Sequence, residues 1–329
     1  MKVLVTGATG FVGSVLLPKL AERFGASALR LLVPPAETLR ADGPWKSVEV
    51  RRGDVAEAGE VADAVHGCDV VLHLAGLISY RRCDRARLFR VNSSGAANVA
   101  RACAQAGTRR LVHVSSTGAT GFRRDRQAAT EATPFNWPSE FHYMTSKRAG
   151  QEAVRRIADE SALDVITVSP AATMGPGDSN PSTPHNRLYA LARSAKVLPT
   201  FTGGLSVVDV RDVADAVLRA MDVEPEPEPF LLAGANRRYS EVLRQIAAGL
   251  GRGVRLVPVP AALAAGVGLA CEAARLRDAP VTYAYGRMSG WHCYHDGSRG
   301  RDLLGHDYRS FEDTVRDGCR FFSEHHLVS

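Results

Sequence analysis

The sequence contains no long hydrophobic run, which argues against a segment that crosses a membrane. A membrane-spanning helix needs about 20 consecutive apolar residues. The nearest candidate, Ala261 to Cys271, is followed by the charged residues Glu272 and Arg275. The chain also begins without the apolar stretch and cleavage site of a signal peptide, since Lys2 leads directly into a predicted strand. We therefore expect a cytoplasmic protein with no membrane partner.

Cysteine is sparse and shows none of the spacings typical of metal sites or redox motifs. The six cysteines form no C-x-x-C pair, so we expect reduced and buried thiols. The run His292-Cys293-Tyr294-His295 could suggest a metal, but no H-x-x-x-H pattern accompanies it and we expect no metal site. His73 and His113 fall in predicted core strands, where a buried imidazole is normally hydrogen-bonded.

Lysine is scarce as well, because only five of the 41 basic residues are lysine. The formal net charge is +6 and the sequence pI is about 9.1. The arginines are scattered along the chain rather than clustered, so we expect no nucleic-acid partner. Solvated faces account for most of this charge, and an anionic cofactor for a smaller part.

The stretch around which the chain is organised is Met1 to Gly13, MKVLVTGATGFVG. Its apolar run is typical of a parallel strand buried on both faces, and a helix is predicted to begin near Phe11. Between them lies a G-x-x-G-x-x-G turn. In dinucleotide-binding folds Gly7 would permit the tight turn, Gly10 would let the backbone approach a pyrophosphate, and Gly13 would let the helix pack closely on the sheet. The helix N-terminus would add unpaired N–H groups and the positive end of its dipole.

Strand and helix patterns alternate along the rest of the chain. Strands are predicted at 28–33, 48–50, 70–74, 110–114, 163–169 and 230–233. Helices are predicted at 57–66, 87–106, 143–160, 240–250 and 311–323, with a further helical stripe within 207–221. Ser310 and Asp313 have the spacing of a capping pair for the last helix. The alternation predicts an α/β protein with a doubly wound parallel sheet.

Small or polar side chains follow several of these strands. Asp54 comes after the third strand, where its carboxylate could accept a hydrogen bond from an adenine amino group, or could simply be a turn residue. Ala75 and Gly76 follow the fourth strand and would leave room for the ribose and phosphates of a cofactor. Ser116 follows the fifth strand. All of them are predicted to meet at the carboxyl edge of the sheet, where ligands bind in such folds.

Tyr143 and Lys147 open a predicted helix and project from one face of it, since they are four residues apart. A free tyrosine has a pKa of about 10, and a cation within about 4 to 6 Å lowers the pKa by about 1 to 3 units. Such a phenol could protonate the alkoxide that forms when a hydride reaches a carbonyl carbon. Ser116 could polarise the carbonyl oxygen, and Lys147 could also hold the nicotinamide ribose.

With these residues in view, the sequence resembles the extended short-chain dehydrogenase/reductase family, the NAD-dependent epimerase/dehydratase group, over essentially its full length. The matching motifs are Thr6-Gly-Ala-Thr-Gly-Phe-Val-Gly13, Gly53-Asp54-Val55, Leu74-Ala75-Gly76, Val91-Asn92, Ser115-Ser116, Tyr143-x-x-x-Lys147, Pro170 and Gly175-Pro-Gly-Asp178. The segment Val208 to Ala214 resembles the dihydroflavonol reductase and 3β-hydroxysteroid dehydrogenase branches.

The resemblance implies functions for individual residues. The implied catalytic residues are Ser116, Tyr143 and Lys147. The implied cofactor-binding residues are Gly7, Gly10, Phe11, Val12, Gly13, Asp54, Val55, Leu74, Ala75, Gly76, Asn92, Ser115, Tyr143, Lys147, Pro170 and Ala171. Candidate substrate residues, chosen by position, are Thr117, Met174, His185 and Phe201.

The resemblance also implies the domain organisation and the assembly. A Rossmann domain that binds NAD(P) would comprise residues 1–170, with 205–233 returning to it. A smaller C-terminal lobe of 171–204 and 234–329 would bind a small-molecule carbonyl or alcohol substrate. Members of this family are often homodimers that associate through two helices of each subunit.

The leading hypothesis is an NAD(P)-dependent oxidoreductase that interconverts a ketone or aldehyde and an alcohol. One alternative is a nucleotide-sugar epimerase or dehydratase, although Ala171-Ala172-Thr173 stands where those relatives usually carry an asparagine. Ser169 stands where members of the family in general usually carry an arginine. Another is a non-catalytic dinucleotide sensor, which would not need a tuned phenol.

The choice between NAD and NADP depends on the end of the second predicted strand. NAD-specific sites place an acidic residue there, and this chain has Pro34 and Pro35 instead. Arg30 and Arg40 are near enough in sequence to attract a 2′-phosphate. We therefore predict that the protein discriminates only weakly between the two cofactors and binds NADP(H) somewhat more tightly, while NAD can also bind.

Overall fold

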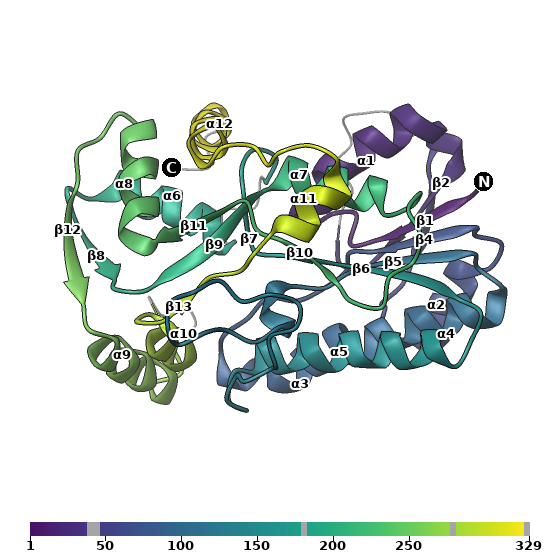
Figure 1. The fold of residues 1–329 in the computed structure, drawn as a ribbon, viewed down its shortest axis with the longest axis horizontal. Coiled ribbons are helices and arrows are strands. Elements are labelled where there is room, and N and C mark those ends of the chain that lie inside the picture. Colours follow the sequence, from purple (N-terminus) through teal and green to yellow (C-terminus); the bar gives the residue numbers. More distant parts are fainter. Residues whose placement is uncertain (38–46, 179–182, 277–280, 326–329) are drawn as a thin grey trace.

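The central feature of the computed structural model is a seven-stranded sheet; the model describes residues 1–37, 47–178, 183–276 and 281–325 (Figure 1). The strand order is β10-β6-β5-β4-β1-β2-β3, and every neighbouring pair is parallel. The strands are β1 (Val3–Thr6), β2 (Leu29–Val33), β3 (Glu49–Arg52), β4 (Val70–His73), β5 (Arg110–Val114), β6 (Asp164–Pro170) and β10 (Phe230–Leu232). The predicted doubly wound parallel sheet is confirmed.

Helices cover both faces of this sheet and bury its apolar strands (Figure 1). On one face lie α1 (Phe11–Phe24), α7 (Val210–Arg219) and α11 (Ser298–Leu304), whose apolar residues share a buried cluster with β1 and β2. On the other face lie α2 (Ala58–Val65), α4 (Ala96–Ala106) and α5 (His142–Asp159). Because successive side chains of a strand point to opposite faces, Val3 and Val5 pack on the first cluster and Leu4 on the second.

The predicted continuous helix over 87–106 is interrupted. The chain forms α3 (Arg85–Phe89), then a π-helical segment over Arg90–Gly95, and only then α4. Gly150 of α5 packs against this segment so closely that a Cβ there would lie 2.1 Å from the carbonyl oxygen of Asn92. π-Helical turns of this kind occur mostly at functional sites. Short 3₁₀ turns lie at Ala26–Ala28, Arg82–Asp84 and Thr117–Ala119.

The remaining strands form two smaller sheets beside the carboxyl edge of the large one (Figure 1). In one, β9 (Gly204–Asp209) pairs with β7 (Ala172–Met174), β11 (Ala235–Arg238) and β13 (His292–Cys293). In the other, β8 (Val197–Phe201) pairs with β12 (Arg255–Val259). The helices here are α6 (Pro184–Ser194), α8 (Tyr239–Gly249), α9 (Ala261–Ala273), α10 (Tyr283–Met288) and α12 (Phe311–Glu324). The predicted capping pair is confirmed, because Ser310 Oγ accepts a hydrogen bond from the backbone N–H of Asp313 at 3.0 Å.

Two expectations about polar core residues need correction. All six cysteines are free, but only Cys68, Cys103 and Cys319 are buried, whereas Cys271 and Cys293 are half-buried and Cys83 is exposed. His73 is hydrogen-bonded through Nδ1 to Thr6 Oγ1 at 2.7 Å, whereas neither ring nitrogen of His113 has a hydrogen-bond partner within the described structure. Burial lowers the pKa of His113 well below its usual value, with the charges of His73 and Lys147 as further causes, so the ring stays neutral. It stacks on the His73 ring with the centroids 5.5 Å apart.

Neither a membrane span nor a metal centre is visible in the described part of the chain. No helix there is long and apolar enough to cross a membrane. Within the same residues, no group of three or more His, Cys, Asp or Glu side chains is placed to hold a metal ion.

Candidate active site

The glycine-rich turn lies between β1 and α1 and leaves one side of its backbone open. Gly7 has a φ of +71° and lies so close to the end of β4 that a Cβ would be 2.6 Å from the Ala75 nitrogen. At Gly13 a Cβ would lie 2.5 Å from the Gly7 carbonyl oxygen, which explains why α1 can begin directly on the turn. A Cβ at Gly10 would meet only the Gly7 oxygen, at 3.3 Å. The backbone at Gly10 is therefore accessible to a phosphate group.

Ser116, Tyr143 and Lys147 come together at the carboxyl end of β5. Ser116 follows this strand, and its hydroxyl oxygen accepts a hydrogen bond from the Gly118 nitrogen at 3.0 Å. Tyr143, in the first turn of α5, lies close to Ser116, because a Cβ at Gly118 would be 3.3 Å from Ser116 Oγ and 3.6 Å from Tyr143 Cε1. Lys147 lies one turn further on, where its ammonium donates to the Val114 carbonyl oxygen at 3.3 Å. Tyr143 and Lys147 are only 8% and 6% exposed, so a ligand reaching them would be largely shielded from water.

Burial, rather than the neighbouring cation, dominates the ionisation of the phenol. Burial raises the pKa of Tyr143, and the nearby Ser116 hydroxyl opposes the rise. The expectation that Lys147 lowers the phenol pKa is therefore not met in the ligand-free protein. Burial also lowers the pKa of Lys147 from 10.5 to about 8. Both groups are held in an environment that disfavours their charged forms.

Asn92 connects this site to the π-helical segment. Its side-chain oxygen accepts from the Leu77 nitrogen at 2.8 Å, and its Nδ2 donates to the Leu77 carbonyl and to Ser146 Oγ. Ser146 lies between the two catalytic candidates of α5 and donates to the Tyr143 carbonyl oxygen at 2.8 Å. A Cβ at Gly76 would lie 2.9 Å from Lys147 Nζ and 3.4 Å from Asn92 Oδ1. The absence of a side chain at Gly76 thus keeps the ammonium accessible.

The other predicted cofactor residues lie along the same edge of the sheet. Leu74 and Ala75 donate their backbone N–H groups to Thr6, and Ser115 donates its hydroxyl to Gln151. The Ala171 nitrogen, next to Pro170 at the end of β6, donates to the Leu232 carbonyl oxygen. Phe11 and Val12 form the first turn of α1.

Asp54 and Val55 differ in their freedom to meet a ligand. The Asp54 carboxylate already accepts a hydrogen bond from Arg90 at 3.0 Å, and its other oxygen accepts from the Ala56 nitrogen. Val55 is 6% exposed and packs beside Gly95 of the π-helical segment. An adenine amino group would therefore share the Asp54 carboxylate with Arg90.

The four candidate substrate residues are not equally placed. Thr117 directly follows Ser116, and Phe201 ends β8 with a half-buried ring. Met174 is 2% exposed and packs in the core of the small sheets with Tyr189 and Phe322. His185 lies in α6, but its side chain is outside the described residues.

A chain of aromatic rings next to Tyr143 was missed from the sequence. The Tyr80 ring meets the Tyr143 ring edge-on, with the centroids 5.7 Å apart. On its other side Tyr80 contacts Tyr285 at 5.1 Å, and Tyr285 contacts Phe201 at 5.5 Å and Tyr239 at 6.4 Å. Burial raises the pKa values of the added tyrosines, so these phenols are neutral. They come from a loop, α8 and α10, and no local sequence pattern indicates that they meet.

The end of β2 also differs from the prediction. Glu37, three residues beyond the predicted position, accepts a hydrogen bond from Thr9 of the glycine-rich turn. Arg52 of β3 donates to the backbone oxygens of Pro34 and Glu37. Arg30 is unavailable to a cofactor, because its guanidinium donates to the Ala64 and His66 carbonyls and pairs with Glu49. Arg40 lies outside the described residues.

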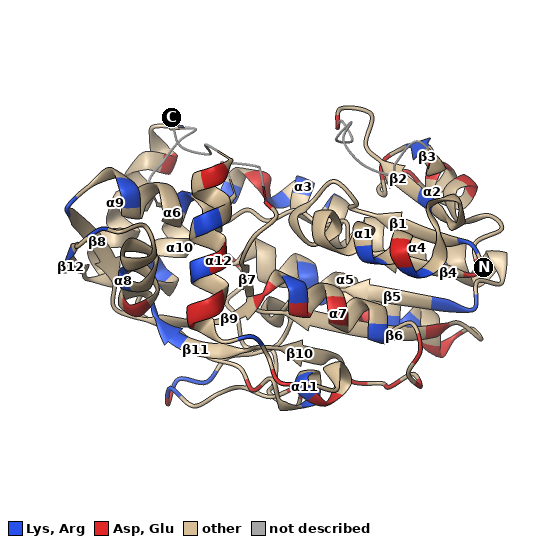
Figure 2. Cartoon of the chain, turned by 90° about the horizontal axis from the view of Figure 1, so that it is seen from above, with Lys and Arg blue, Asp and Glu red and all other residues tan. Residues whose placement is uncertain are grey.

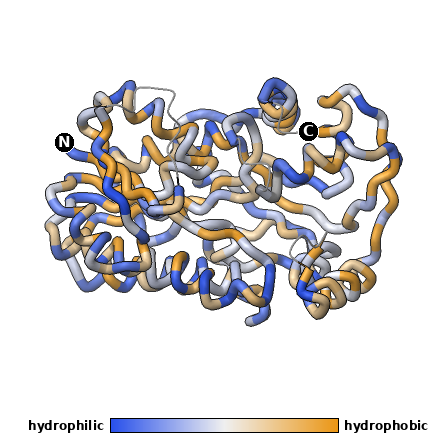
Figure 3. Tube along the Cα trace, turned by 180° about the vertical axis from the view of Figure 1, so that it is seen from behind, coloured by the Kyte–Doolittle hydropathy of each residue, from blue (hydrophilic) through white to orange (hydrophobic). Residues whose placement is uncertain are grey.

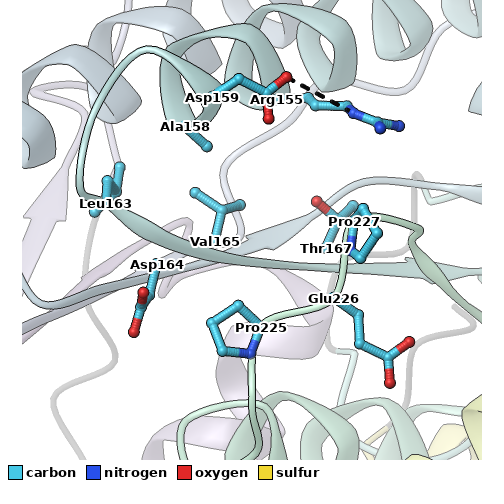
Figure 4. Close-up of a pocket in the computed structure, with 10 residues that line it drawn as sticks. All are labelled: Arg155, Ala158, Asp159, Leu163, Asp164, Val165, Thr167, Pro225, Glu226 and Pro227. Atoms are coloured by element: carbon cyan, nitrogen blue, oxygen red, sulfur yellow. Dashed lines mark ion pairs between the residues drawn. The ribbon is translucent and has the colours of Figure 1, made fainter.

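A separate hollow lies at the far end of α5 (Figure 4). Side chains of α5, β6 and the acidic Pro-rich linker line it, with Arg155 paired to Asp159 on one wall. At about 1.5 Å per residue, the α5 residues that line this hollow, Arg155 to Asp159, lie about 18 to 24 Å along the helix from Tyr143. It is not part of the candidate active site.

The parallel sheet and the open glycine turn are typical of proteins that bind a dinucleotide. Comparison with known proteins agrees: residues 3–233 match the NAD dependent epimerase/dehydratase family, and the chain belongs to that family. The predicted family is therefore confirmed, and the protein is an oxidoreductase that depends on NAD(P).

Curated relatives cover nearly the whole chain. Sterol demethylase protein B of Methylococcus capsulatus is 29% identical, and the alignment covers 100% of both chains. A putative dihydroflavonol 4-reductase of Synechocystis sp. is 30% identical over 98% of this chain and 95% of the relative. Ceramide reductase of Caulobacter vibrioides is 33% identical over 87% of this chain and 82% of the relative.

Solved structures show the same fold. The crystal structure of gox2253 has a TM-score of 0.84 and 28% identity, and the alignment covers 100% of this chain and 99% of that one. A dTDP-glucose 4,6-dehydratase from Streptomyces venezuelae with NAD bound has a TM-score of 0.78 at 20% identity, covering 99% of this chain and 98% of that one. At that identity the second comparison supports the fold alone.

Proposed function

We propose that this protein interconverts a ketone or aldehyde and the corresponding alcohol by hydride transfer, with Ser116, Tyr143 and Lys147 as its catalytic residues. The observation that carries the proposal is the grouping of three side chains at the end of β5: Ser116 and Tyr143 both lie beside Gly118, and Lys147 lies one helical turn from Tyr143. A dinucleotide sensor would have no use for a phenol held in this position. Asn92 and Ser146 would act as positioning residues for α5.

The residues present fit a nicotinamide dinucleotide. The backbone at Gly10 is open, and Gly76 has no side chain that would cover the Lys147 ammonium. The bound cofactor would supply or accept the hydride. Lys147 would hold the nicotinamide ribose, and Pro170 and Ala171 would line the ring.

The proton is handled by Tyr143 and Ser116. In the reductive direction the Ser116 hydroxyl donates a hydrogen bond to the carbonyl oxygen, and the Tyr143 O–H transfers its proton to that oxygen as the carbonyl carbon gains the hydride. In the oxidative direction the Tyr143 phenolate removes the alcohol proton. Because burial raises the pKa of Tyr143, the neutral phenol needed for reduction prevails at neutral pH.

We further propose that residues 171–204 and 234–329 form the substrate lobe and that its ligand is a hydrophobic carbonyl compound. The rings of Tyr80, Tyr239, Tyr285 and Phe201 extend from Tyr143 into that lobe. The relatives named for sterols, ceramides and dihydroflavonols support the same class of substrate. A screen of steroid, long-chain and aromatic ketones and alcohols, followed by cofactor absorbance, tests the proposal. Turnover only of nucleotide sugars would contradict it.

Tyr285→Ala tests whether the chain of aromatic rings binds the substrate. We expect kcat/KM for a hydrophobic ketone to fall about tenfold or more, mainly through KM, because a buried aromatic contact is worth about 1.5 kcal/mol or more. Tyr294→Phe is the matched control, since Tyr294 lies outside this ring chain and should keep its steady-state constants. An unchanged KM for Tyr285→Ala would show that this ring does not contact the substrate.

We propose that both cofactors bind and that NADP(H) binds somewhat more tightly. The cation of Arg52 would strengthen NADP(H) binding, and the carboxylate of Glu37 would weaken it. A carboxylate repels a 2′-phosphate by about 4 kcal/mol at about 4 Å and an effective dielectric of about 20, and exposure at Glu37 reduces this greatly. We expect Glu37→Gln to tighten NADP(H) about tenfold relative to NAD(H), and Arg52→Gln to weaken NADP(H) by a similar factor.

Dissociation constants of both cofactors at low salt measure this effect. Glu57→Gln, an exposed carboxylate paired with Arg90, is the control and should leave the ratio unchanged. Wild-type protein that binds NAD(H) more than about tenfold tighter, a difference of about 1.4 kcal/mol, would show that the lean toward NADP(H) is wrong.

A further inference from the structure

Helix α9 turns only apolar residues toward solvent. Its exposed positions are Ala262, Leu263, Gly266, Val267, Leu269, Ala270 and Ala273. A surface helix normally presents polar or charged residues on its outer face. Leu263 is 59% exposed and Val267 is 41% exposed, and they stand one turn apart. The outward face of α9 is therefore built like a face that packs on another surface.

The packing of α9 on the rest of the protein does not need these large side chains. Its inner face contacts α10 through small residues: a Cβ at Gly268 would lie 2.4 Å from the Thr282 backbone, and one at Gly286 would lie 2.6 Å from Ala264. The helix is thus held by close backbone contact. The exposed side chains of Leu263, Val267 and Leu269 therefore do not contribute to the packing of this helix on the core.

The apolar surface continues over the adjoining two-stranded sheet. Pro199 of β8 and Val257 of β12 are paired neighbours and both are exposed. Among the described residues nine large hydrophobic side chains are exposed, and this region holds six of them: Val197, Val257, Leu263, Val267, Leu269 and Leu276. Figure 1 places β8, β12 and α9 together at the end of the molecule away from the N-terminus, and Figure 3 shows β12 largely in the hydrophobic colour. We call these six residues the apolar end.

Cations border the apolar end. Lys196, Arg252, Arg255 and Arg275 are exposed, and none of them forms an ion pair within the described structure. Figure 2 shows blue segments near the labels β8 and β12, where Lys196 precedes β8 and Arg255 begins β12. Over residues 251–276 the only acidic side chain is Glu272, and one of its oxygens accepts a hydrogen bond from the Tyr283 nitrogen. The border of the surface is therefore positively charged.

This charge distinguishes between the partners that could cover the surface. A second copy in a symmetric dimer would meet the same patch and bring like charges together. An anionic lipid surface would instead accept the apolar side chains among its acyl chains and attract the cations at its headgroups. The charge pattern favours the lipid.

We propose that α9 and the apolar end dock this protein on the surface of an anionic lipid bilayer, without spanning it. Docking would place α10, which packs against α9 and carries Tyr285 of the chain of aromatic rings, close to the bilayer. The binding itself does not depend on the proposed reaction.

Cosedimentation with vesicles tests the proposal. We expect the wild-type chain to bind vesicles of phosphatidylglycerol mixed with phosphatidylcholine, to bind phosphatidylcholine alone at least about tenfold more weakly, and to lose affinity as salt is added. Leu263→Asp combined with Val267→Asp should reduce binding about tenfold or more. Ala62→Asp adds a charge to the exposed face of α2 and serves as the matched control. Arg252→Gln combined with Arg255→Gln should remove much of the salt dependence.

Circular dichroism and melting temperature establish that each variant is folded, and a folded double-aspartate variant with lost binding supports the proposal. Wild-type protein that stays in the supernatant, or binding that the apolar substitutions leave unchanged, would overturn it. So would a dimer in solution that Leu263→Asp dissociates, because the surface would then belong to a second copy. If the double-aspartate variant does not fold, the test depends on Arg252→Gln combined with Arg255→Gln. Vesicle binding by that variant with the same salt dependence as wild type would contradict the proposal.

Discussion

Replacing Tyr143 by phenylalanine is expected to reduce turnover by a factor of about 10² to 10⁴, which is the usual contribution of a positioned general acid or base. The substitution removes one oxygen and keeps the ring, so the edge contact with Tyr80 should persist. The cofactor should bind nearly as before, because the phosphate-binding turn and Lys147 are untouched. Steady-state kinetics and a cofactor titration on the same preparation separate the two effects.

The control for this experiment is Tyr308→Phe. Tyr308 donates its hydroxyl hydrogen to the Gly297 carbonyl oxygen at 3.0 Å, so this variant also removes one phenolic hydroxyl that is shielded in part from water. It is not part of the Ser116, Tyr143 and Lys147 group and should retain turnover within a few-fold. If Tyr143→Phe behaved like this control, Tyr143 would not be the proton donor.

Much of the fold could be predicted because local sequence determines it. The strand at Arg110–Val114 has the predicted bounds, since it is a short apolar run between polar turns. The first strand and helix likewise follow from the glycine turn, whose spacing is set by the backbone contacts of Gly7 and Gly13. The π-helical segment around Asn92 could not be predicted, because it depends on the close approach of Gly150 from a different helix.

The same distinction applies to the candidate site. Ser116, Tyr143 and Lys147 could be proposed because each belongs to a short motif. Glu37 approaches Thr9, and Tyr285 approaches Tyr80, only through contacts between distant parts of the chain. The pKa of Tyr143 was also misjudged, because sequence spacing indicates a nearby cation but does not indicate how deeply both groups are buried. Sequence motifs therefore predict the catalytic candidates, but they do not predict contacts between distant segments or the depth of burial of a side chain.

Lys147 is expected to lower the stability of the ligand-free protein. Its side chain is 6% exposed, and burial lowers its pKa to about 8 from the ordinary value of 10.5. The folded state binds this proton more weakly than the unfolded state does. The charged ammonium therefore lowers the free energy of unfolding. The cost is fully present below about pH 8 and declines as the pH rises toward 10.5.

Lys147→Met should therefore stabilise the protein while reducing its turnover. A difference of one pKa unit corresponds to about 1.36 kcal/mol, so at pH 7 we expect the free energy of unfolding to rise by up to about 3 kcal/mol. Loss of the hydrogen bond to the Val114 carbonyl would subtract about 1 kcal/mol. Near pH 10 the gain from the removed charge should shrink to about 1 kcal/mol. Turnover should fall about 10²-fold or more, because the residue next to the phenol and the cofactor ribose is lost.

Urea unfolding at the two pH values, together with steady-state kinetics, measures both effects. Lys196→Met removes an exposed lysine and should change stability by less than about 0.5 kcal/mol at either pH. Stabilisation that is larger near pH 10 than at pH 7 would contradict the lowered pKa. Retained turnover in Lys147→Met would show that the reaction does not require the Lys147 ammonium. A stabilised but inactive variant would show that this buried cation is kept for catalysis against its cost in folding.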